Sequence, residues 1–166
     1  MDDIATRIAT NAIDETRLLA LARDLHLCDG GVDDKDPPHS QNWATNWKVK
    51  TMCVLLHLLY EPAKRPNPRK SRSSYGLKHD LEHLFQTYAP ELSSVHTNWV
   101  GNGELILAMA YCGFVPYKTS APNTYYYLTD LREGKNNKTG DKKIRADFSE
   151  EIVRTILRKK VEECSA

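Results

Sequence analysis

The spacing of apolar residues predicts a chain built mainly from helices. An apolar position every three or four residues marks the buried face of an amphipathic helix. Five segments show this period: 4–25, 42–60, 74–88, 102–112 and 147–157. Helix-terminating residues follow three of these segments, at Pro62, Pro90 and Gly113. The first segment reads as two pieces, so we expect five or six helices.

After Gly113 the pattern becomes strand-like. Residues 114–117 and 124–128 are rich in aromatic and β-branched side chains and flank a short loop, which is typical of a β-hairpin. Two helices followed by a hairpin, over residues 74–128, is the order of a winged helix-turn-helix. We therefore expect a mainly α fold: a compact helical domain with one small β-hairpin and a winged-helix-like centre. The helix from Asn102 would enter the DNA major groove.

The same pattern divides the chain into parts of one domain. We expect N-terminal helices over residues 1–61 and a basic connector over 62–73. The winged-helix-like centre follows over 74–128, then a mobile loop over 130–146 and a C-terminal helix over 147–166.

Composition places the chain among ordinary globular proteins. Hydrophobic residues make up 40% of its 166 residues and charged residues 27%, and the formal net charge is +1. The whole molecule therefore has no general attraction for polyanions, and any nucleic-acid binding must depend on where the cations lie. The four cysteines form no Cys-x-x-Cys pair, which argues against a zinc ribbon and for reduced thiols.

No membrane or secretory segment is visible in the sequence. The acidic start of the chain is not followed by the apolar core of a signal peptide. The longest apolar run, residues 52–60, is far shorter than the about 20 residues that a spanning helix needs. We expect a cytoplasmic protein without a cofactor.

The connector is the most basic part of the chain. It holds five cations, three prolines and no acid: Lys64, Arg65, Arg69, Lys70 and Arg72 are the cations. Prolines prevent a helix, so the segment should be exposed and extended, with its cations free to contact phosphates. Further nucleic-acid contacts are expected from Ser74, Tyr75, Lys78, His79, Asn102 and Lys118. Against specific base reading, the helix from Asn102 carries Glu104 and no Arg, Lys or Gln.

A second constellation is His79-Asp80-Leu81-Glu82-His83. Histidines four residues apart on a helix can share a zinc ion, and Glu82 would then be the general base of a metal-dependent hydrolase. A third ligand would still be required, with Glu104 or His96 as candidates. Because such a pattern also arises by chance on solvated helices, we expect no bound metal.

Two further features have ordinary structural interpretations. His57 falls among apolar residues and is expected to be a core histidine bonded to a backbone carbonyl. The run Tyr125-Tyr126-Tyr127 could stack on bases, but alternation along a strand would bury part of it. Packing in the core or in an interface is the expected use of these tyrosines.

One part of the chain resembles known sequences. Ser74-Tyr75-Gly76-Leu77-Lys78-His79 with Glu82 is followed by Asn102-Gly103-Glu104-Leu105, by Gly113-Phe114 and by Asn123. This order resembles a pattern in small uncharacterised proteins of bacteriophages and mobile elements, and it covers residues 73–128. The resemblance implies such an origin and a shared surface used on a partner, and it implies no activity.

These observations predict a non-enzymatic phage- or mobile-element-type protein that binds nucleic acid. The connector, the start of the helix at Ser74 and the hairpin would form the binding surface. The alternative is a protein-binding inhibitor of a host defence or secretion complex, because near-zero net charge, eight tyrosines and three tryptophans also suit a protein interface.

Overall fold

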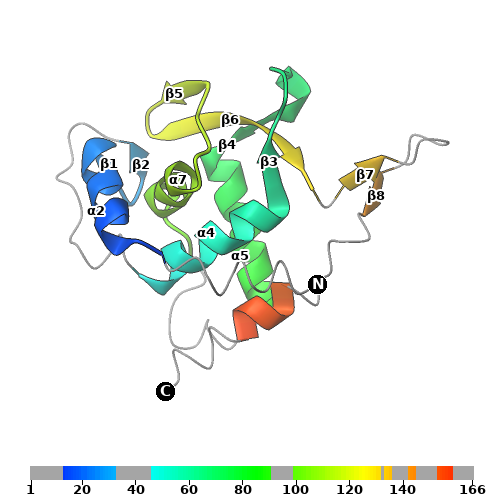
Figure 1. Ribbon diagram of the computed structural model, residues 1–166, viewed down its shortest axis with the longest axis horizontal. Helices are drawn as coiled ribbons and strands as arrows, with labels where there is room; N and C mark the ends of the chain where they lie inside the picture. The colour runs from blue at the N-terminus through cyan, green and yellow to red at the C-terminus, as the bar shows by residue number, and fades with distance from the viewer. Residues whose placement is uncertain are drawn as a thin grey trace.

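The computed structural model describes residues 13–32, 46–90, 99–131, 133–135, 142–144 and 153–158. Within these residues the fold is mixed α/β, with helices packed beneath a small antiparallel sheet (Figure 1). The predicted helical stretch before residue 13 and most of the predicted C-terminal helix lie outside the described residues. No described helix is long and apolar enough to cross a membrane.

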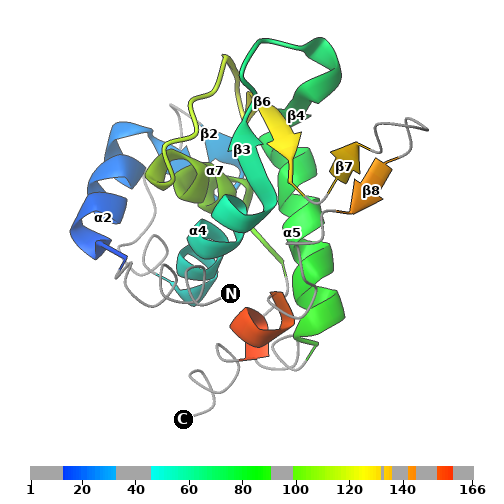
Figure 2. The ribbon, with the colours of Figure 1, turned by 45° about the vertical axis from the view of Figure 1, so that its right-hand side comes forward.

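The helices surround one central helix. Helices α2 (Glu15–Asp24), α4 (Trp47–Leu59) and α5 (Ser74–Tyr88) all pack against α7 (Asn102–Tyr111). In Figure 1, α7 is seen nearly end-on between α2, α4 and the sheet, and Figure 2 shows α5 as a long column beside it. Every residue from 102 to 109 is buried. The last helical turn, residues 153–158, adds Val153, Ile156 and Leu157 to the core.

The sheet is organised around one long strand. Strand β6 (Asn123–Asp130) pairs antiparallel with β3 (Tyr60–Pro62), β4 (Ser71–Ser73) and β5 (Lys118–Ser120). Two smaller hairpins join β1 (Leu27–Cys28) to β2 (Gly31–Val32) and β7 (Glu133–Lys135) to β8 (Lys142–Ile144). The second of these hairpins lies within the segment that was predicted to be a mobile loop.

Side chains alternate along β6 as the sequence predicts. Thr124, Tyr126 and Leu128 are buried against the helices, whereas Tyr125 and Tyr127 lie on the outer face and are partly exposed. Burial raises the pKa of Tyr126 to about 12, and a hydrogen bond from Thr124 Oγ1 opposes this rise. The inner phenol therefore remains neutral at physiological pH.

The prediction of a mainly α fold with one hairpin is wrong. Strands β3 and β4 frame the basic connector and have three residues each, which is too short to show a period of two. The winged-helix-like centre is also wrong, because a recognition helix must expose side chains to the groove and α7 is buried. His57 is exposed rather than in the core, and its ring lies 6.2 Å from that of Phe114.

The central position of α7 predicts how mutations affect stability. Leu107 is fully buried, so Leu107→Ala should lower the free energy of unfolding by about 2–5 kcal/mol in chemical denaturation. The control is Val115→Ala, at a side chain that is 83% exposed, with an expected change below about 0.5 kcal/mol. Equal, small effects of both substitutions would contradict the buried position of α7.

Candidate functional site

The first turn of α5 joins that helix to the sheet. Ser73 caps the helix, because its Oγ accepts a hydrogen bond from Gly76 N at 3.1 Å. Ser74 was expected to be exposed and to contact nucleic acid. Instead it is buried, and its Oγ accepts a hydrogen bond from Thr124 N in β6 at 3.2 Å.

A buried carboxylate on α5 gathers three donors. Glu82 Oε1 accepts hydrogen bonds from Val100 N at 2.8 Å and from Lys78 Nζ at 3.2 Å. Its other oxygen, Oε2, lies 2.5 Å from His79 Nδ1. The side chains of Glu82 and Lys78 are 11% and 5% exposed, whereas that of His79 is 50% exposed. Glu82 therefore neutralises a buried ammonium, fixes the backbone before α7 and orients a surface imidazole.

A second buried carboxylate holds the same backbone from the other side. Glu104 Oε2 accepts a hydrogen bond from Gly101 N at 2.8 Å and lies 3.1 Å from Lys48 Nζ. Its Oε1 accepts from Asn46 Nδ2, which also links it to the cap of α4. Because Glu104 is occupied in this way, it does not serve as a third metal ligand beside His79.

Asn102 connects α7 to two turns. Its side-chain amide donates to Gly30 O at 2.9 Å, Pro122 O at 3.1 Å and Asn123 Oδ1 at 3.0 Å. Asn102 is 3% exposed. Gly31 packs closely against both Asn102 and Pro122. Its φ is +130°, and an added Cβ would lie 1.9 Å from Pro122 O, so only glycine fits here. The role of Asn102 is thus to hold the β1–β2 and β5–β6 turns together.

The residues that resemble the phage and mobile-element pattern therefore lie close together in the fold, although most of the polar ones face inward. Around this buried network, Tyr75 and Trp99 remain 53% and 49% exposed. The Lys78 ammonium lies 5.0 Å from the centre of the Tyr75 ring and 5.4 Å from that of Trp99. The Tyr75 ring also meets His79 edge-on, with ring centres 4.7 Å apart. We call the exposed residues Tyr75, His79 and Trp99 the α5 surface.

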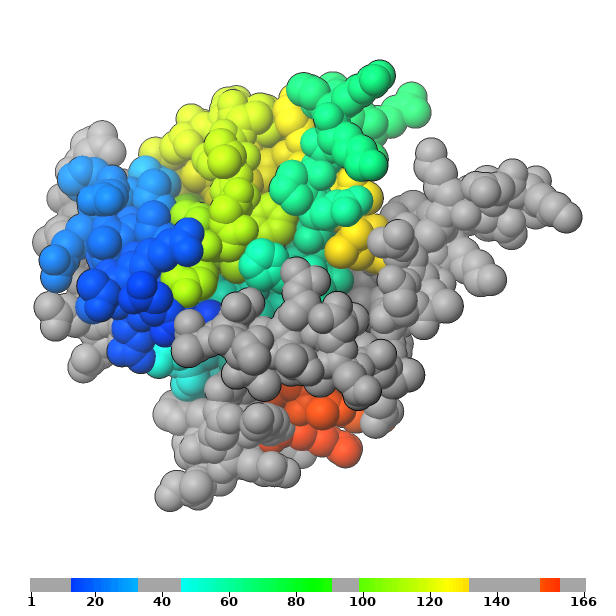
Figure 3. All heavy atoms as spheres, in the orientation of Figure 1, coloured from blue at the N-terminus to red at the C-terminus, as the bar shows by residue number. Residues whose placement is uncertain are grey.

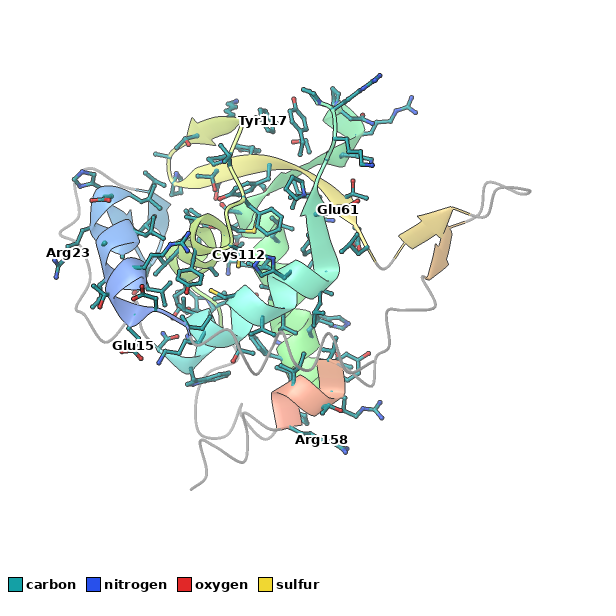
Figure 4. All side chains as sticks on the ribbon, in the orientation of Figure 1. Glu15, Arg23, Glu61, Cys112, Tyr117 and Arg158 are labelled. Atoms are coloured by element: carbon teal, nitrogen blue, oxygen red, sulfur yellow. The ribbon has the colours of Figure 1, made fainter. Side chains whose placement is uncertain are left out.

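A second surface occupies the outer side of the sheet. Tyr117 stacks on Tyr127 with ring centres 3.9 Å apart and planes 9° from parallel, and Tyr125 lies 6.4 Å from Tyr117. Tyr117 OH and Ser71 Oγ are 2.8 Å apart, which fixes the ring over β4. Lys118 Nζ lies 5.4 Å from the centre of the Tyr125 ring. We call Tyr117, Tyr125 and Tyr127 the tyrosine face; Figure 4 labels Tyr117 beside the sheet.

The basic connector borders the tyrosine face. Lys64, Arg65, Arg69 and Lys70 are exposed, in the segment between β3 and β4 that projects at the top of Figure 3. Lys70 Nζ donates to Thr129 Oγ1 on β6 at 3.0 Å, which places this cation beside the outer face of the sheet. Arg72 instead pairs with Asp80, whose carboxylate also accepts a hydrogen bond from Tyr60 OH.

Comparisons with protein-family models, with curated proteins and with solved structures find no significant match.

The structure separates the residues predicted to bind nucleic acid into two groups. The buried group contains Ser74, Lys78 and Asn102, and Arg72 is half-buried in an ion pair. The exposed group contains the remaining seven: Lys64, Arg65, Arg69, Lys70, Tyr75, His79 and Lys118. No three metal-ligating side chains converge among the described residues. His83 is exposed, and His96 lies outside the described residues.

Two features of the surface were missed by the sequence reasoning. The predicted strand 114–117 contains Tyr117 but gave it no role, and no role was predicted for Trp99. The period of two along residues 124–128 was the available signal for Tyr125 and Tyr127, because it places both on the face opposite Tyr126. No local pattern could have placed Tyr117 on Tyr127, since that contact depends on how β5 pairs with β6.

One cysteine pair lies away from both surfaces. Cys112 Sγ donates a hydrogen bond to Cys53 O at 3.2 Å. Hydrogen bonding to Cys53 and burial raise the pKa of the Cys112 thiol well above its usual value. The thiol is therefore protonated and a poor nucleophile.

The buried network predicts unequal effects of two chemically identical substitutions. Glu82→Gln would leave the Lys78 ammonium buried without a counter-charge, and should lower the free energy of unfolding by about 3–5 kcal/mol. Glu15→Gln breaks an exposed pair with Lys50 and should cost about 0–1 kcal/mol. Urea denaturation of both variants measures the difference. Similar costs for the two would show that Glu82 is not an internal anchor.

Proposed function

We propose that this protein binds single-stranded nucleic acid across the tyrosine face. The observation that carries the proposal is the Tyr117–Tyr127 stack on the outer side of the sheet, with cations beside it. Bases would stack on the exposed tyrosine rings. Phosphates would contact Lys118 and the cations of the connector.

The physical basis is that each base has a flat π surface, so stacking on aromatic side chains tolerates any sequence. Exposed bases are available only in single strands, loops and ends. A sheet face with aromatic side chains and cations at its edge suits such a strand. The formal charge of +1 does not oppose this, because the connector concentrates its cations on one side of the sheet.

The buried α7 is the reason to prefer a single strand over a duplex. Sequence reading in duplex DNA needs a helix or ribbon whose polar side chains reach the major groove. Residues 102–109 are buried and cannot do this. The proposal therefore keeps the predicted nucleic-acid partner and abandons the predicted mode of binding. The origin in a phage or mobile element stays a proposal that rests on the resemblance.

A protein partner is the competing proposal. Exposed aromatic residues are also enriched in protein interfaces, and Val115 and Tyr117 form exposed apolar surface near β5. The cations of the connector distinguish the two proposals, because phosphate binding depends on salt in a predictable way.

Neutralising the connector should weaken binding and reduce its salt dependence. In a variant with Lys64, Arg65, Arg69 and Lys70 changed to Gln, the slope of log K against log salt should fall by about 0.7 for each phosphate that the protein no longer neutralises. Fluorescence anisotropy with labelled single-stranded DNA and RNA over a salt series measures this slope.

The control for this variant removes cations elsewhere. Arg23 and Arg158 are exposed and lie away from the sheet (Figure 4), so Arg23→Gln with Arg158→Gln should leave the slope unchanged. Absence of binding by the unaltered protein at low salt would contradict the proposal and favour a protein partner.

Removing one tyrosine ring should weaken binding without changing its salt dependence. Stacking of a base on an aromatic side chain contributes about 1–3 kcal/mol, so Tyr117→Ala should lower affinity by about 5- to 150-fold. Tyr117→Phe keeps the ring and removes only the hydroxyl group that meets Ser71, so it should retain most of the affinity. If both variants bind like the unaltered protein, the tyrosine face is not the binding surface.

A further inference from the structure

The α5 surface contains a histidine held like a general base. An ionised carboxylate can only accept hydrogen bonds, so in this pair Glu82 Oε2 accepts a hydrogen bond from His79 Nδ1 at 2.5 Å. This contact fixes the orientation of the ring, and in a neutral imidazole that donates from Nδ1 the lone pair lies on Nε2. The His79 side chain is half exposed, while its partner carboxylate is buried.

Glu82 is itself held rigidly. Its Oε1 is bound by Val100 N and by Lys78 Nζ, and the Lys78 ammonium offsets its charge. A base oriented by a fixed carboxylate is the arrangement found where enzymes remove a proton from a hydroxyl group.

Among the described residues, the two serines at the start of α5 are engaged in other hydrogen bonds. Ser73 Oγ caps α5, and Ser74 Oγ is buried against Thr124 N. A bound molecule can supply the hydroxyl instead. RNA carries such a hydroxyl, at the 2′ position beside each phosphodiester.

We propose that His79 is the general base of an RNA-cleaving reaction on the α5 surface. This inference rests on the proposed function, with the bound strand being RNA. Strand β4 connects the two surfaces, because Ser73 pairs with Tyr125 of the tyrosine face and Tyr75 follows two residues later at the start of α5. A strand that leaves the tyrosine face along β4 reaches Tyr75, and His79 lies in ring contact with it.

The reaction is an internal transesterification. His79 Nε2 takes the proton of the 2′-hydroxyl, and the 2′-oxygen forms a bond to the adjacent phosphorus. The bond from phosphorus to the 5′-oxygen breaks, and this oxygen takes a proton from water. The hydroxide left behind takes the proton from His79. The products are a 2′,3′-cyclic phosphate and a 5′-hydroxyl end, and no oxidant or further reactant is required.

The exposed aromatic rings would position the phosphodiester that is cleaved. Tyr75 and Trp99 stand on either side of the Lys78 ammonium and offer faces on which bases can stack. Lys78 is 4% exposed, so its role is to pair with Glu82 rather than to contact phosphate. Lys78 and Glu82 are positioning residues, and His79 alone acts on the substrate.

The experiment compares two forms of one RNA strand. The strand with 2′-hydroxyls should be cleaved to cyclic phosphate and 5′-hydroxyl ends, whereas the fully 2′-O-methylated strand should be bound and remain intact. His79→Gln should lower the cleavage rate by about 10²- to 10⁴-fold, the usual contribution of a general base, with unchanged affinity for the methylated strand. His83→Gln, at an exposed histidine one turn further along α5, should cleave normally.

Chemical rescue provides a second readout. Imidazole added to His79→Gly should restore part of the cleavage, which a merely structural role of His79 would not predict. Binding of both strands without cleavage would overturn this inference and leave the proposed function standing. Absence of binding would overturn both. Cleavage that persists in His79→Gln would show that another group is the base.

Discussion

The structure depends on two buried carboxylates that hold the backbone leading into α7. Glu82 binds Val100 N from α5, and Glu104 binds Gly101 N from within α7. Burying a carboxylate is costly unless cations and hydrogen-bond donors compensate for the lost water, and here Lys78 and Lys48 supply the positive charges. These two ion pairs and their hydrogen bonds connect α5, α4 and α7 at the backbone of Val100 and Gly101.

The same network decides which parts of the molecule can contact a partner. Because it fixes the start of α7 inside, Asn102 and the rest of that helix are occupied with holding the fold. The outer side of the sheet and the first turns of α5 remain, and they carry the exposed rings of Tyr117 and Tyr75, with Trp99 beside them just before α7. Binding and the proposed chemistry would thus lie on neighbouring surfaces that β4 connects.

The sequence allowed prediction of the elements whose signals are local. Helices α4, α5 and α7 follow from apolar spacing, and strand β6 from its aromatic composition. The first strand of the hairpin was predicted at 114–117, whereas β5 is Lys118–Ser120. Strands β3 and β4 could not be predicted, because three residues show no period and their pairing partner β6 lies more than fifty residues away. The winged-helix prediction failed for a related reason: helix order does not reveal which helix is enclosed by the others.

The polar residues of the motif at 74–102 were also assigned the wrong partners from the sequence. Ser74, Lys78 and Asn102 were interpreted as contacts to a partner, whereas the structure uses all three internally. Ser74 and Asn102 join segments distant in sequence, and Lys78 pairs with Glu82 one turn along α5. A polar residue in a motif indicates a specific partner atom, and only the fold shows whether that atom belongs to the same chain. The tyrosines were the opposite case, since two of the three in the run face outward.

The central claim is that a single strand lies on the tyrosine face, and photo-crosslinking tests it most directly. A short strand containing 4-thiouridine would be irradiated with the protein, and the attached peptides would be identified by mass spectrometry. The account predicts attachment at Tyr117, Tyr125 or Tyr127, with neighbouring sites in the connector at 64–70. Attachment confined to α2 or to residues 153–158, on other sides of the molecule, would contradict it.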